Sequence, residues 1–271
     1  MEEKVFTVLD IDYVDKIGLN TIILKDVDGN LPKIAAGQFM MVGMRENNVK
    51  LLLRPYTIAE VDYKQSTVTI LVEIRGAGSR RLVEECQRIM CLKESQRYVR
   101  DLPNTIRGIL PLGRGWTIKD IEKGERILIV SGGAGRASVG YLREELEKKG
   151  IETYILMGMK GITKEGKKIK EEDRIYITTE DGSLGFKGRV TDHPMLEGKF
   201  DRVYACGPRG MLRALTEKIG RRAPLMEVSL DNIMLCGVGV CLCCAEKLTD
   251  GRNVRVCKEG PVFNVKELGW I

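Results

Sequence analysis

Four cysteines near the C-terminus constrain this chain of 271 residues more than any other feature. Cys236 is followed by a gap of four residues to Cys241, a gap of two residues to Cys244 and a gap of twelve residues to Cys257. The first part of this pattern is the spacing of plant-type 2Fe-2S clusters, in which closely spaced thiolates converge from one short loop. The sequence therefore predicts a cluster held by all four thiolates.

Two other uses of these cysteines stay open on the spacing alone. Four thiolates can hold a structural zinc ion, although zinc ribbons usually contain two separated CxxC pairs. Cys241 and Cys244 also form a CxxC pair of the kind used in thiol redox chemistry. Gly237 and Gly239 favour the cluster, because glycine permits the close backbone approach that a loop around inorganic sulfide needs. We interpret Cys243, which lies between two proposed ligands, as a non-ligand.

Composition and charge narrow the class of protein. Hydrophobic residues make up 43% of the chain, but no apolar run approaches the roughly twenty residues that span a bilayer. The net charge is +6, with basic residues interspersed among acidic ones rather than gathered into a nucleic-acid face. The first residues lack the features of a signal peptide, so we expect reduced cysteines in the cytoplasm. We expect neither nucleic-acid binding nor membrane insertion.

The chain contains a single histidine, His193, in the turn-like segment Thr191–Pro194. Catalytic triads and many general-base mechanisms depend on histidine. We expect His193 to be a surface turn residue and predict no catalytic acid or base in this chain.

The order of strand and helix patterns predicts a multidomain protein of class β plus α/β. Residues 1–122 contain short β segments separated by turns, including the alternating stretch Thr67–Glu73, which together predict an antiparallel barrel. Residues 123–222 begin with a buried-strand pattern at Arg126–Val130 that leads into a glycine-rich turn and a helix. This βαβ pattern predicts a Rossmann-like nucleotide-binding domain.

Residues 223–271 form the third predicted domain, a small module that contains the cluster cysteines. The turn Asp250-Gly251 and the following segment Val254–Cys257 predict a hairpin whose return strand brings in the fourth ligand. A fourth thiolate from this separate segment would complete the four ligands of the cluster.

Two turns in the second predicted domain are candidates for nucleotide binding. One leads into a helix, whose N-terminus favours a phosphate, and the other follows a strand that ends at the same edge of the sheet. Tight turns also use glycine for purely steric reasons, so it is the pairing of the two that predicts a nucleotide site. The candidate residues are Gly132, Gly133 and Gly135 in the first turn and Cys206, Gly207 and Pro208 in the second.

The segment Arg54–Ile58, with the sequence Arg-Pro-Tyr-Thr-Ile, resembles the flavin signature of the ferredoxin reductase-like family. Arg75–Leu82 is similar to the loop and helix start that hold the FAD pyrophosphate in that family, and Pro111–Trp116 is similar to its Gly-Pro-Leu-Gly loop. The resemblance implies that the arginine contacts flavin phosphates and that the tyrosine and threonine lie at the flavin ring. The residues it implies for FAD are Arg54, Pro55, Tyr56, Thr57, Gly78, Ser79 and Gly113.

The cysteine segment, continued by Cys257–Phe263, resembles one branch of that family, the electron-transfer subunits of NAD-dependent dihydroorotate dehydrogenase. The resemblance implies an oxidoreductase subunit that relays electrons between NAD(H), FAD and a 2Fe-2S cluster. It also implies an FMN-containing partner subunit that converts dihydroorotate to orotate in pyrimidine biosynthesis, in a heterotetramer or a larger complex. A relay subunit for another dehydrogenase, a hydrogenase or a ferredoxin couple remains an alternative, as does a non-catalytic zinc-binding assembly protein.

Two segments depart from the family pattern. The family's nucleotide loop ends in an Ala-Pro pair, whereas this chain has Arg136-Ala137-Ser138, so Arg136 either meets a phosphate or is an exposed first-turn residue. The choice between NAD and NADP stays open, with Lys160 a possible contact for a 2′-phosphate. The stretch Cys86–Gly108 is longer and more polar than the family's turn. We expect it to form a loop that contacts a partner or covers the flavin.

Overall fold

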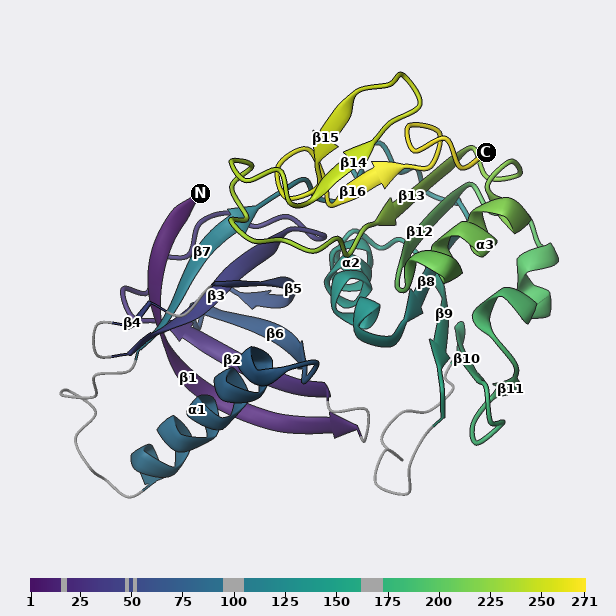
Figure 1. The fold of residues 1–271 in the computed structure, drawn as a ribbon. Helices are drawn as coiled ribbons and strands as arrows, with labels where there is room; N and C mark the ends of the chain where they lie inside the picture. Colours follow the sequence, from purple (N-terminus) through teal and green to yellow (C-terminus); the bar gives the residue numbers. More distant parts are fainter. Residues whose placement is uncertain (16–18, 47–48, 51–52, 95–104, 162–172) are drawn as a thin grey trace.

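The computed structural model describes residues 1–15, 19–46, 49–50, 53–94, 105–161 and 173–271, and Figure 1 shows their arrangement. One sheet contains β1 (Glu2–Asp15), β2 (Leu19–Asp26), β3 (Phe39–Glu46), β4 (Val49–Lys50), β5 (Arg54–Asp62), β6 (Thr67–Glu73) and β7 (Thr105–Leu112). A second sheet contains β8 (Ile127–Gly132), β9 (Thr153–Met159), β10 (Ile175–Thr179), β11 (Phe186–Lys187), β12 (Arg202–Cys206), β13 (Leu225–Ser229) and β16 (Val262–Asn264). A small hairpin consists of β14 (Ala245–Lys247) and β15 (Asn253–Arg255). The α-helices are α1 (Ala77–Glu94), α2 (Arg136–Lys148) and α3 (Arg209–Ile219), and 3-10 helices cover Gly133–Gly135, Val190–Asp192 and Pro194–Glu197.

The first sheet is antiparallel and closes into a barrel. Its order is β4-β3-β5-β6-β2-β1-β7, and the additional pairing of β3 with β7 closes the ring. Alternate residues of a strand point to opposite faces, so β3 serves two cores. Met40 and Val42 belong to the core inside the barrel, whereas Phe39 and Met41 belong to the other core, which also contains Cys244 and Cys257. Strand β3 therefore separates the barrel interior from the cluster module.

Helix α1 packs on the barrel through a single apolar face. Leu82, Cys86 and Ile89 are buried in the barrel core at the spacing of successive helical turns. Figure 1 shows α1 lying along the barrel beside β1 and β2. The N-terminus of α1 is thereby fixed close to the start of β5.

The second sheet is parallel from β11 through β10, β9, β8 and β12 to β13, and β16 is added antiparallel to β13. All six residues of β8 are buried, as expected for a parallel strand covered on both faces. Helix α2 covers the face turned to the barrel and α3 the opposite face (Figure 1). Because β16 comes from the C-terminal segment, the cysteine module extends this sheet.

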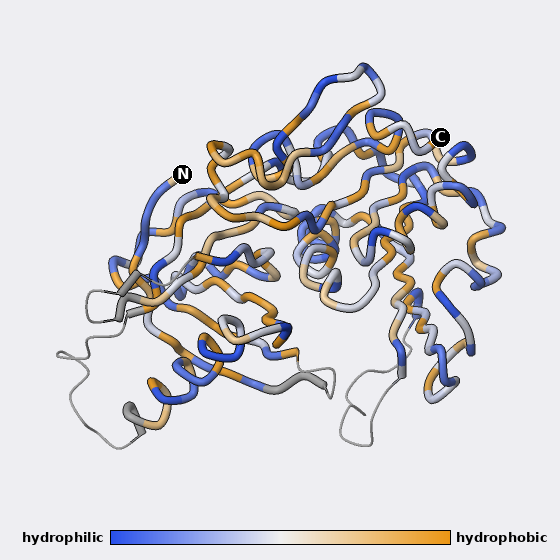
Figure 2. Tube along the Cα trace, viewed as in Figure 1, coloured by the Kyte–Doolittle hydropathy of each residue, from blue (hydrophilic) through white to orange (hydrophobic). Residues whose placement is uncertain are grey.

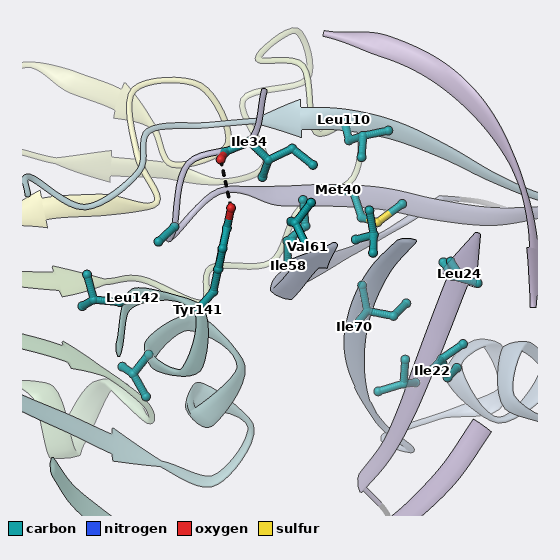
Figure 3. Close-up of a cluster of buried hydrophobic side chains, with 14 of the residues drawn as sticks. Ile22, Leu24, Ile34, Met40, Ile58, Val61, Ile70, Leu110, Tyr141 and Leu142 are labelled. Carbon is teal, nitrogen blue, oxygen red and sulfur yellow. Dashed lines mark hydrogen bonds between the residues drawn. The ribbon is translucent and has the colours of Figure 1, made fainter. Parts of the chain in front are cut away.

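The barrel and the α/β sheet share a continuous core. Figure 3 shows Tyr141 of α2 reaching the barrel, where its hydroxyl donates a hydrogen bond of 3.2 Å to the carbonyl of Ile34. Leu142 lies next to it in the same cluster as Met40 and Ile58 of the barrel. Figure 2 shows hydrophobic residues along the strands of both sheets and hydrophilic residues on many of the turns. The two units are therefore packed together rather than joined only by a linker.

The expected fold class is confirmed by the antiparallel barrel, the α/β sheet and the cysteine module, whereas the exact domain boundaries stay a prediction. Cys257 lies two residues beyond the end of β15, in a turn rather than on the return strand. No helix in the described part of the chain is both long and apolar enough to cross a membrane.

Two expectations about single segments were wrong. His193 was expected at the surface but is buried and packs against the ring of Phe186. It caps the 3-10 helix that begins at Pro194, because its ring nitrogen accepts a hydrogen bond of 3.2 Å from the Met195 N–H. Cys86–Gly108 is not one loop, because its first part completes α1 and its last part begins β7. Residues 95–104 lie outside the described residues, so the expected contact with a partner or flavin stays a prediction.

Candidate functional site

The arginine of the expected flavin signature lies against the N-terminus of α1. A side chain at Gly78 would occupy the place of the Arg54 guanidinium, so the guanidinium lies directly against the start of the helix. The first N–H groups of a helix have no partners within the helix, and the helix dipole favours an anion there. A guanidinium over a helix N-terminus forms a site suited to a phosphate group.

Tyr56 supplies a second feature that fits a bound ligand. Its hydroxyl is buried and has no hydrogen-bond partner among the described residues. Burial raises the pKa of Tyr56 to about 12, although the nearby charge of Arg54 lowers it, so the hydroxyl stays protonated and can donate. Buried polar groups are nearly always paired, and a ligand acceptor beside Tyr56 would satisfy this one. Thr57 follows on the same strand, opposite Phe39 of β3.

Ser79 and Gly113 have structural roles in this region. The Ser79 hydroxyl accepts hydrogen bonds from the N–H groups of Arg75 and Gly76, at 3.0 and 3.3 Å, and donates one to the Gly76 carbonyl. It therefore shapes the loop before α1. Gly113 has a φ of +72°, and a side chain there would lie 2.6 Å from the carbonyl oxygen of Gly260. Gly113 thus marks the close approach of the barrel to the cysteine module.

The two turns expected to bind a nucleotide are brought together. A side chain at Gly135 would collide with the carbonyl of Cys206, and one at Gly132 would lie 3.2 Å from Pro208 Cδ. At Gly133 a side chain would meet nothing within 4 Å. The sequence singled out these glycines for a ligand, but packing between the two turns explains Gly132 and Gly135. Gly133 is the position in this turn where a ligand could approach the backbone.

Arg136 follows directly at the start of α2. Its Nε donates a hydrogen bond of 3.3 Å to the Gly133 carbonyl, and its Nη1 lies 3.7 Å from Met159 Sδ at the end of β9. The guanidinium therefore lies between the glycine turn and the end of the neighbouring strand, where a dinucleotide crosses the sheet edge in Rossmann-like folds.

We predict that Gly135→Ala lowers the free energy of unfolding, by about 1–3 kcal/mol, because the backbone carbonyl of Cys206 must move away from the new methyl group. Gly140→Ala, in the helix that Gly135 caps, is the matched control. Its methyl group would meet only the Ala59 carbonyl oxygen, at 3.8 Å, so higher helix propensity should stabilise the protein by up to about 1 kcal/mol. Urea denaturation measures both, and equal effects of the two changes would contradict the packing argument.

The loop that begins at Cys236 directs backbone N–H groups at a thiol. Val240 N and Cys241 N lie 3.4 and 3.5 Å from Cys236 Sγ. Burial raises the pKa of Cys236, but hydrogen bonds from the backbone N–H groups of Cys241 and Val238 outweigh it and lower the value to about 6. The thiolate is the form that binds metals, and N–H donors to sulfur are typical of iron-sulfur sites.

The other two predicted ligands form a buried pair. Cys244 and Cys257 are each 2% exposed, and Cys257 N donates a hydrogen bond of 3.4 Å to Cys244 Sγ. Burial and the neighbouring Cys244 raise the pKa of Cys257 to about 12. The positive charge of Arg255 acts on both thiols, and its guanidinium donates to the Gly239 carbonyl at 3.2 Å. Arg255 also forms an ion pair with Glu259, so it supports the loop without adding a net positive charge.

The four thiols are therefore arranged as two pairs, Cys236 with Cys241 and Cys244 with Cys257. Within the described ranges, no three Cys, His, Asp or Glu side chains converge on a point where one metal ion could bind. Zinc needs four ligands around a single ion, whereas each iron of a 2Fe-2S cluster takes two protein thiolates. Two pairs of thiols suit the two irons of a 2Fe-2S cluster. Cys241 and Cys243 are both exposed, so exposure does not separate ligand from non-ligand, and the interpretation of Cys243 as a non-ligand stays a prediction.

The cysteine loop lies on β3, the barrel strand that pairs with the strand of the flavin signature, β5. Gly237 has a φ of +69°, and a side chain there would collide with Met41 of β3. Met41 is paired with Pro55 of β5, the residue between Arg54 and Tyr56. Arg75, at the other side of the flavin region, bonds to Asp231 at 3.2 Å. The cluster and flavin candidates are thus neighbours across one strand pair.

Three residues where the barrel meets the α/β sheet and the cysteine module were not predicted from the sequence: Met41, Arg114 and Glu227. Met41 gave no signal, because one more apolar residue in a barrel strand is ordinary. Glu227 could have been noticed as a charge inside the apolar strand Leu225–Ser229, since buried carboxylates are rare unless they are paired.

Comparisons with known proteins decide the family. The chain is 36% identical over 237 residues, 86% of each chain, to the "Dihydroorotate dehydrogenase B (NAD(+)), electron transfer subunit" of Caldanaerobacter subterraneus subsp. tengcongensis. The chain belongs to the family of dihydroorotate dehydrogenase B electron transfer subunits. The subunit of that name from Fusobacterium nucleatum is 32% identical and covers 90% of this chain and 93% of its own. Residues 231–269 match the iron-sulfur cluster binding domain of dihydroorotate dehydrogenase B.

A solved structure, from work on the NADH-dependent reduced ferredoxin-NADP oxidoreductase, has the same fold. Its TM-score is 0.74 at 23% sequence identity, and the alignment covers 98% of this chain and 90% of that chain. The family resemblance seen in the sequence is confirmed, as is the assignment as an oxidoreductase subunit for electron transfer. FAD, the 2Fe-2S cluster and NAD(H) are supported by family and fold. An electron transfer subunit implies a catalytic partner subunit, and the individual site residues stay predictions.

Proposed function

We propose that this chain relays electrons between NAD(H) and a catalytic partner through FAD and a 2Fe-2S cluster. When bound, FAD exchanges a hydride, two electrons and one proton, with the nicotinamide, and the cluster exchanges electrons one at a time. The chain itself supplies binding, orientation and shielding from water. The observation that supports this most directly is the contact of Gly237 with Met41, which sets the cysteine loop against the strand pair of the flavin signature.

Within this proposal the barrel binds FAD. Arg54 and the N-terminus of α1 bind its phosphates, with Gly78 allowing the guanidinium to approach the helix. The unpartnered hydroxyl of Tyr56 and the neighbouring Thr57 bind near the flavin ring. Pro55 fixes the backbone between them, opposite Met41.

The α/β sheet binds the nicotinamide nucleotide at the edge formed by its two packed turns. Gly133 offers open backbone, and Gly132, Gly135 and Gly207 hold the turns together. Cys206 lies at the end of β12, and burial raises the pKa of its thiol to about 12, so it stays neutral next to the nucleotide. A neutral thiol adds no charge that would oppose hydride transfer.

The cysteine module passes electrons to the partner, which we propose to be an FMN-containing dehydrogenase subunit that acts on dihydroorotate in a cytoplasmic heterotetramer or larger complex. Apolar side chains are exposed around the cluster loop, with Ile233 82%, Leu235 48%, Val240 80% and Leu242 62% exposed. Figure 2 shows this segment between β13 and β14 as hydrophobic where it stands out from the fold. Exposed apolar patches of this kind are typical of protein interfaces.

We predict that Ile233→Asp weakens association with the catalytic subunit by at least about tenfold, because a charge is introduced into an apolar interface core. Val27→Asp is the matched control, since Val27 is 61% exposed on the barrel and away from the cluster loop. Surface plasmon resonance on the immobilised partner measures both variants, with cluster absorbance showing that each site is intact. Equal affinities of the two variants would exclude this patch as the docking site.

An anaerobic titration of the purified protein with NADH tests the relay. The flavin and iron-sulfur absorbance bands should both bleach as NADH is added, because electrons pass from nicotinamide through FAD to the cluster. Bleaching by dithionite but not by NADH would overturn the nicotinamide step. A protein that contains zinc and lacks both bands would overturn the proposal as a whole.

A further inference from the structure

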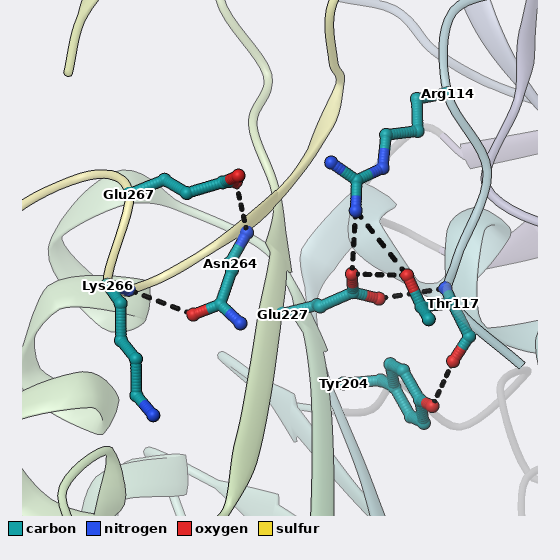
Figure 4. Close-up of polar contacts among 7 residues, drawn as sticks. All are labelled: Arg114, Thr117, Tyr204, Glu227, Asn264, Lys266 and Glu267. Atoms are coloured by element: carbon teal, nitrogen blue, oxygen red, sulfur yellow. Dashed lines mark hydrogen bonds and ion pairs between the residues drawn. The ribbon is translucent and has the colours of Figure 1, made fainter. Parts of the chain in front are cut away.

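Glu227 is a carboxylate buried in the middle of the molecule. It lies on β13, between β12 of the α/β sheet and β16 of the cysteine module, and is only 1% exposed. Its Oε1 accepts a hydrogen bond of 2.7 Å from the Thr117 hydroxyl, and its Oε2 accepts one of 2.9 Å from the Thr117 N–H. Arg114 Nη2 lies 3.3 Å from Oε1 and supplies the opposite charge. Figure 4 shows these groups converging on the carboxylate.

The donors to Glu227 come from the segment that leaves the barrel. Trp116 of this segment donates from its backbone to the Ala36 carbonyl of the barrel at 2.9 Å and from its ring to the Ser138 carbonyl of α2 at 3.2 Å. The Tyr204 hydroxyl of β12 donates to the Thr117 carbonyl at 2.6 Å (Figure 4). Both faces of the segment are thus bonded, one to the barrel and one to the α/β sheet.

The cysteine module meets the same point. The backbone N–H of Arg114 donates a hydrogen bond to the Gly260 carbonyl. The backbone of Arg114 also forms an isolated parallel β-bridge with Pro261, in the segment between Cys257 and β16. Glu227 itself is paired with Asn264 of β16. The three residues Arg114, Thr117 and Glu227, called here the Glu227 junction, therefore connect the barrel to the α/β sheet and to the module of the cysteines.

We infer that Glu227 is a positioning residue for the relay, which holds the flavin-binding barrel in register with the sheet and module that bind the other two redox groups. The inference rests on the proposed function, because both electron steps of the relay cross this junction. One step joins nicotinamide on the sheet to flavin on the barrel, and the other joins flavin to the cluster. Such steps depend steeply on distance, so a misplacement of about 1 Å can cost up to about a hundredfold in rate.

A carboxylate is suited to this role because it offers two acceptor oxygens and no donor. Glutamine has nearly the same shape, but its amide nitrogen would face either the Thr117 N–H or the pair formed by Arg114 and the Thr117 hydroxyl. One donor would then lose its acceptor and meet another donor in a buried site. Glu227→Gln therefore loosens the junction without opening a cavity.

The test uses Glu227→Gln in the full-length protein loaded with its cofactors. Anaerobic stopped-flow absorbance after mixing with NADH follows flavin reduction and cluster reduction separately. We expect both steps to slow by at least about tenfold. FAD affinity and the electron paramagnetic resonance spectrum of the dithionite-reduced cluster should stay unchanged. FAD binds within the barrel and the cluster within the cysteine module, so neither site is shared between two units. Hydrogen exchange at the amides of residues 114–117 should rise by at least about tenfold.

Glu125→Gln is the matched control. Glu125 also accepts hydrogen bonds from an arginine, Arg202 of β12. Arg202 donates in addition to the Asp120 carbonyl of the connecting segment, so the bonds of this pair run within the α/β side of the junction. The control should leave both rates unchanged. Thr117→Val serves as a second variant if Glu227→Gln folds poorly, since it removes one donor and keeps the charge pair. It should slow the same two steps to a smaller extent.

Rates within about twofold of the parent protein, with or without a lower melting temperature, would overturn the inference and leave Glu227 a structural residue. A change in FAD affinity or cluster spectrum as large as the change in rate would also overturn it, because the damage would then be local. A parent protein whose bands do not bleach with NADH would overturn the proposed relay instead. Hydrogen exchange at the amides of residues 114–117 would still show whether Glu227 stabilises the Glu227 junction.

Discussion

Cys257→Ser should abolish most of the iron-sulfur absorbance of the purified protein while its flavin absorbance remains. Cys257 is buried beside Cys244, far along the chain from the cysteine loop, and no other thiol in the described part of the chain can replace it in that pair. A serine oxygen is a poorer ligand for iron than a thiolate. Because a metal site contributes to folding, thermal stability of the C-terminal module should also fall.

Cys243→Ser is the control for this experiment. Cys243 belongs to neither of the two cysteine pairs, so its removal should leave cluster absorbance and iron content unchanged. Iron, sulfide and zinc analysis of both variants completes the measurement. Loss of the cluster in Cys243→Ser, or its retention in Cys257→Ser, would show that the predicted ligand set is wrong.

Arg54→Ala should weaken FAD binding by roughly ten- to a hundredfold, since charge-assisted hydrogen bonds contribute about 1.5–3 kcal/mol each. The guanidinium lies over the N-terminus of α1, and its removal takes away a positive charge placed directly against Gly78. The increase in flavin fluorescence on dilution measures the dissociation constant. Cluster absorbance should persist, because the guanidinium lies against the start of α1 and the cysteine loop lies against Met41 of β3.

Arg88→Ala is the control, because Arg88 lies farther along α1 and pairs with Glu85. It removes an equal charge from the same helix without touching its N-terminus. A decrease in FAD affinity of less than about threefold in Arg54→Ala, or equal decreases in both variants, would place the phosphate site elsewhere.

Much of the architecture followed from local patterns in the sequence. The alternation in Thr67–Glu73 predicts a barrel strand because side chains alternate between the two faces, and β6 has these bounds. The continuous apolar stretch before Gly132 predicts a strand buried on both faces, as β8 is. The cysteine spacing predicts a cluster because it is set by the reach of one short loop. Such signals depend on neighbours in the chain, so the sequence alone contains them.

Local patterns do not contain the contacts made by segments from elsewhere in the fold. Gly132 and Gly135 suggested a ligand, which stays a prediction, and the structure adds that the turn at Cys206 packs against them. His193 was expected at the surface, but the rings of Tyr176 and Phe186 pack against it. Cys206 lies far along the chain from the glycine turn, and the ring of Tyr176 reaches His193 from β10. Neither periodicity nor composition predicts which separate segments meet.

The sequence by itself determined the class of fold, the family and the chemistry of the cysteines, because these depend on residue type and short-range spacing. Only the tertiary structure decided that the four thiols form two pairs, that Gly237 rests on Met41, and that Glu227 joins three parts of the molecule. These contacts exist because barrel closure and sheet extension by β16 bring distant segments together. The relative placement of the redox sites is thus a property of the packed core, to which every part of the chain contributes.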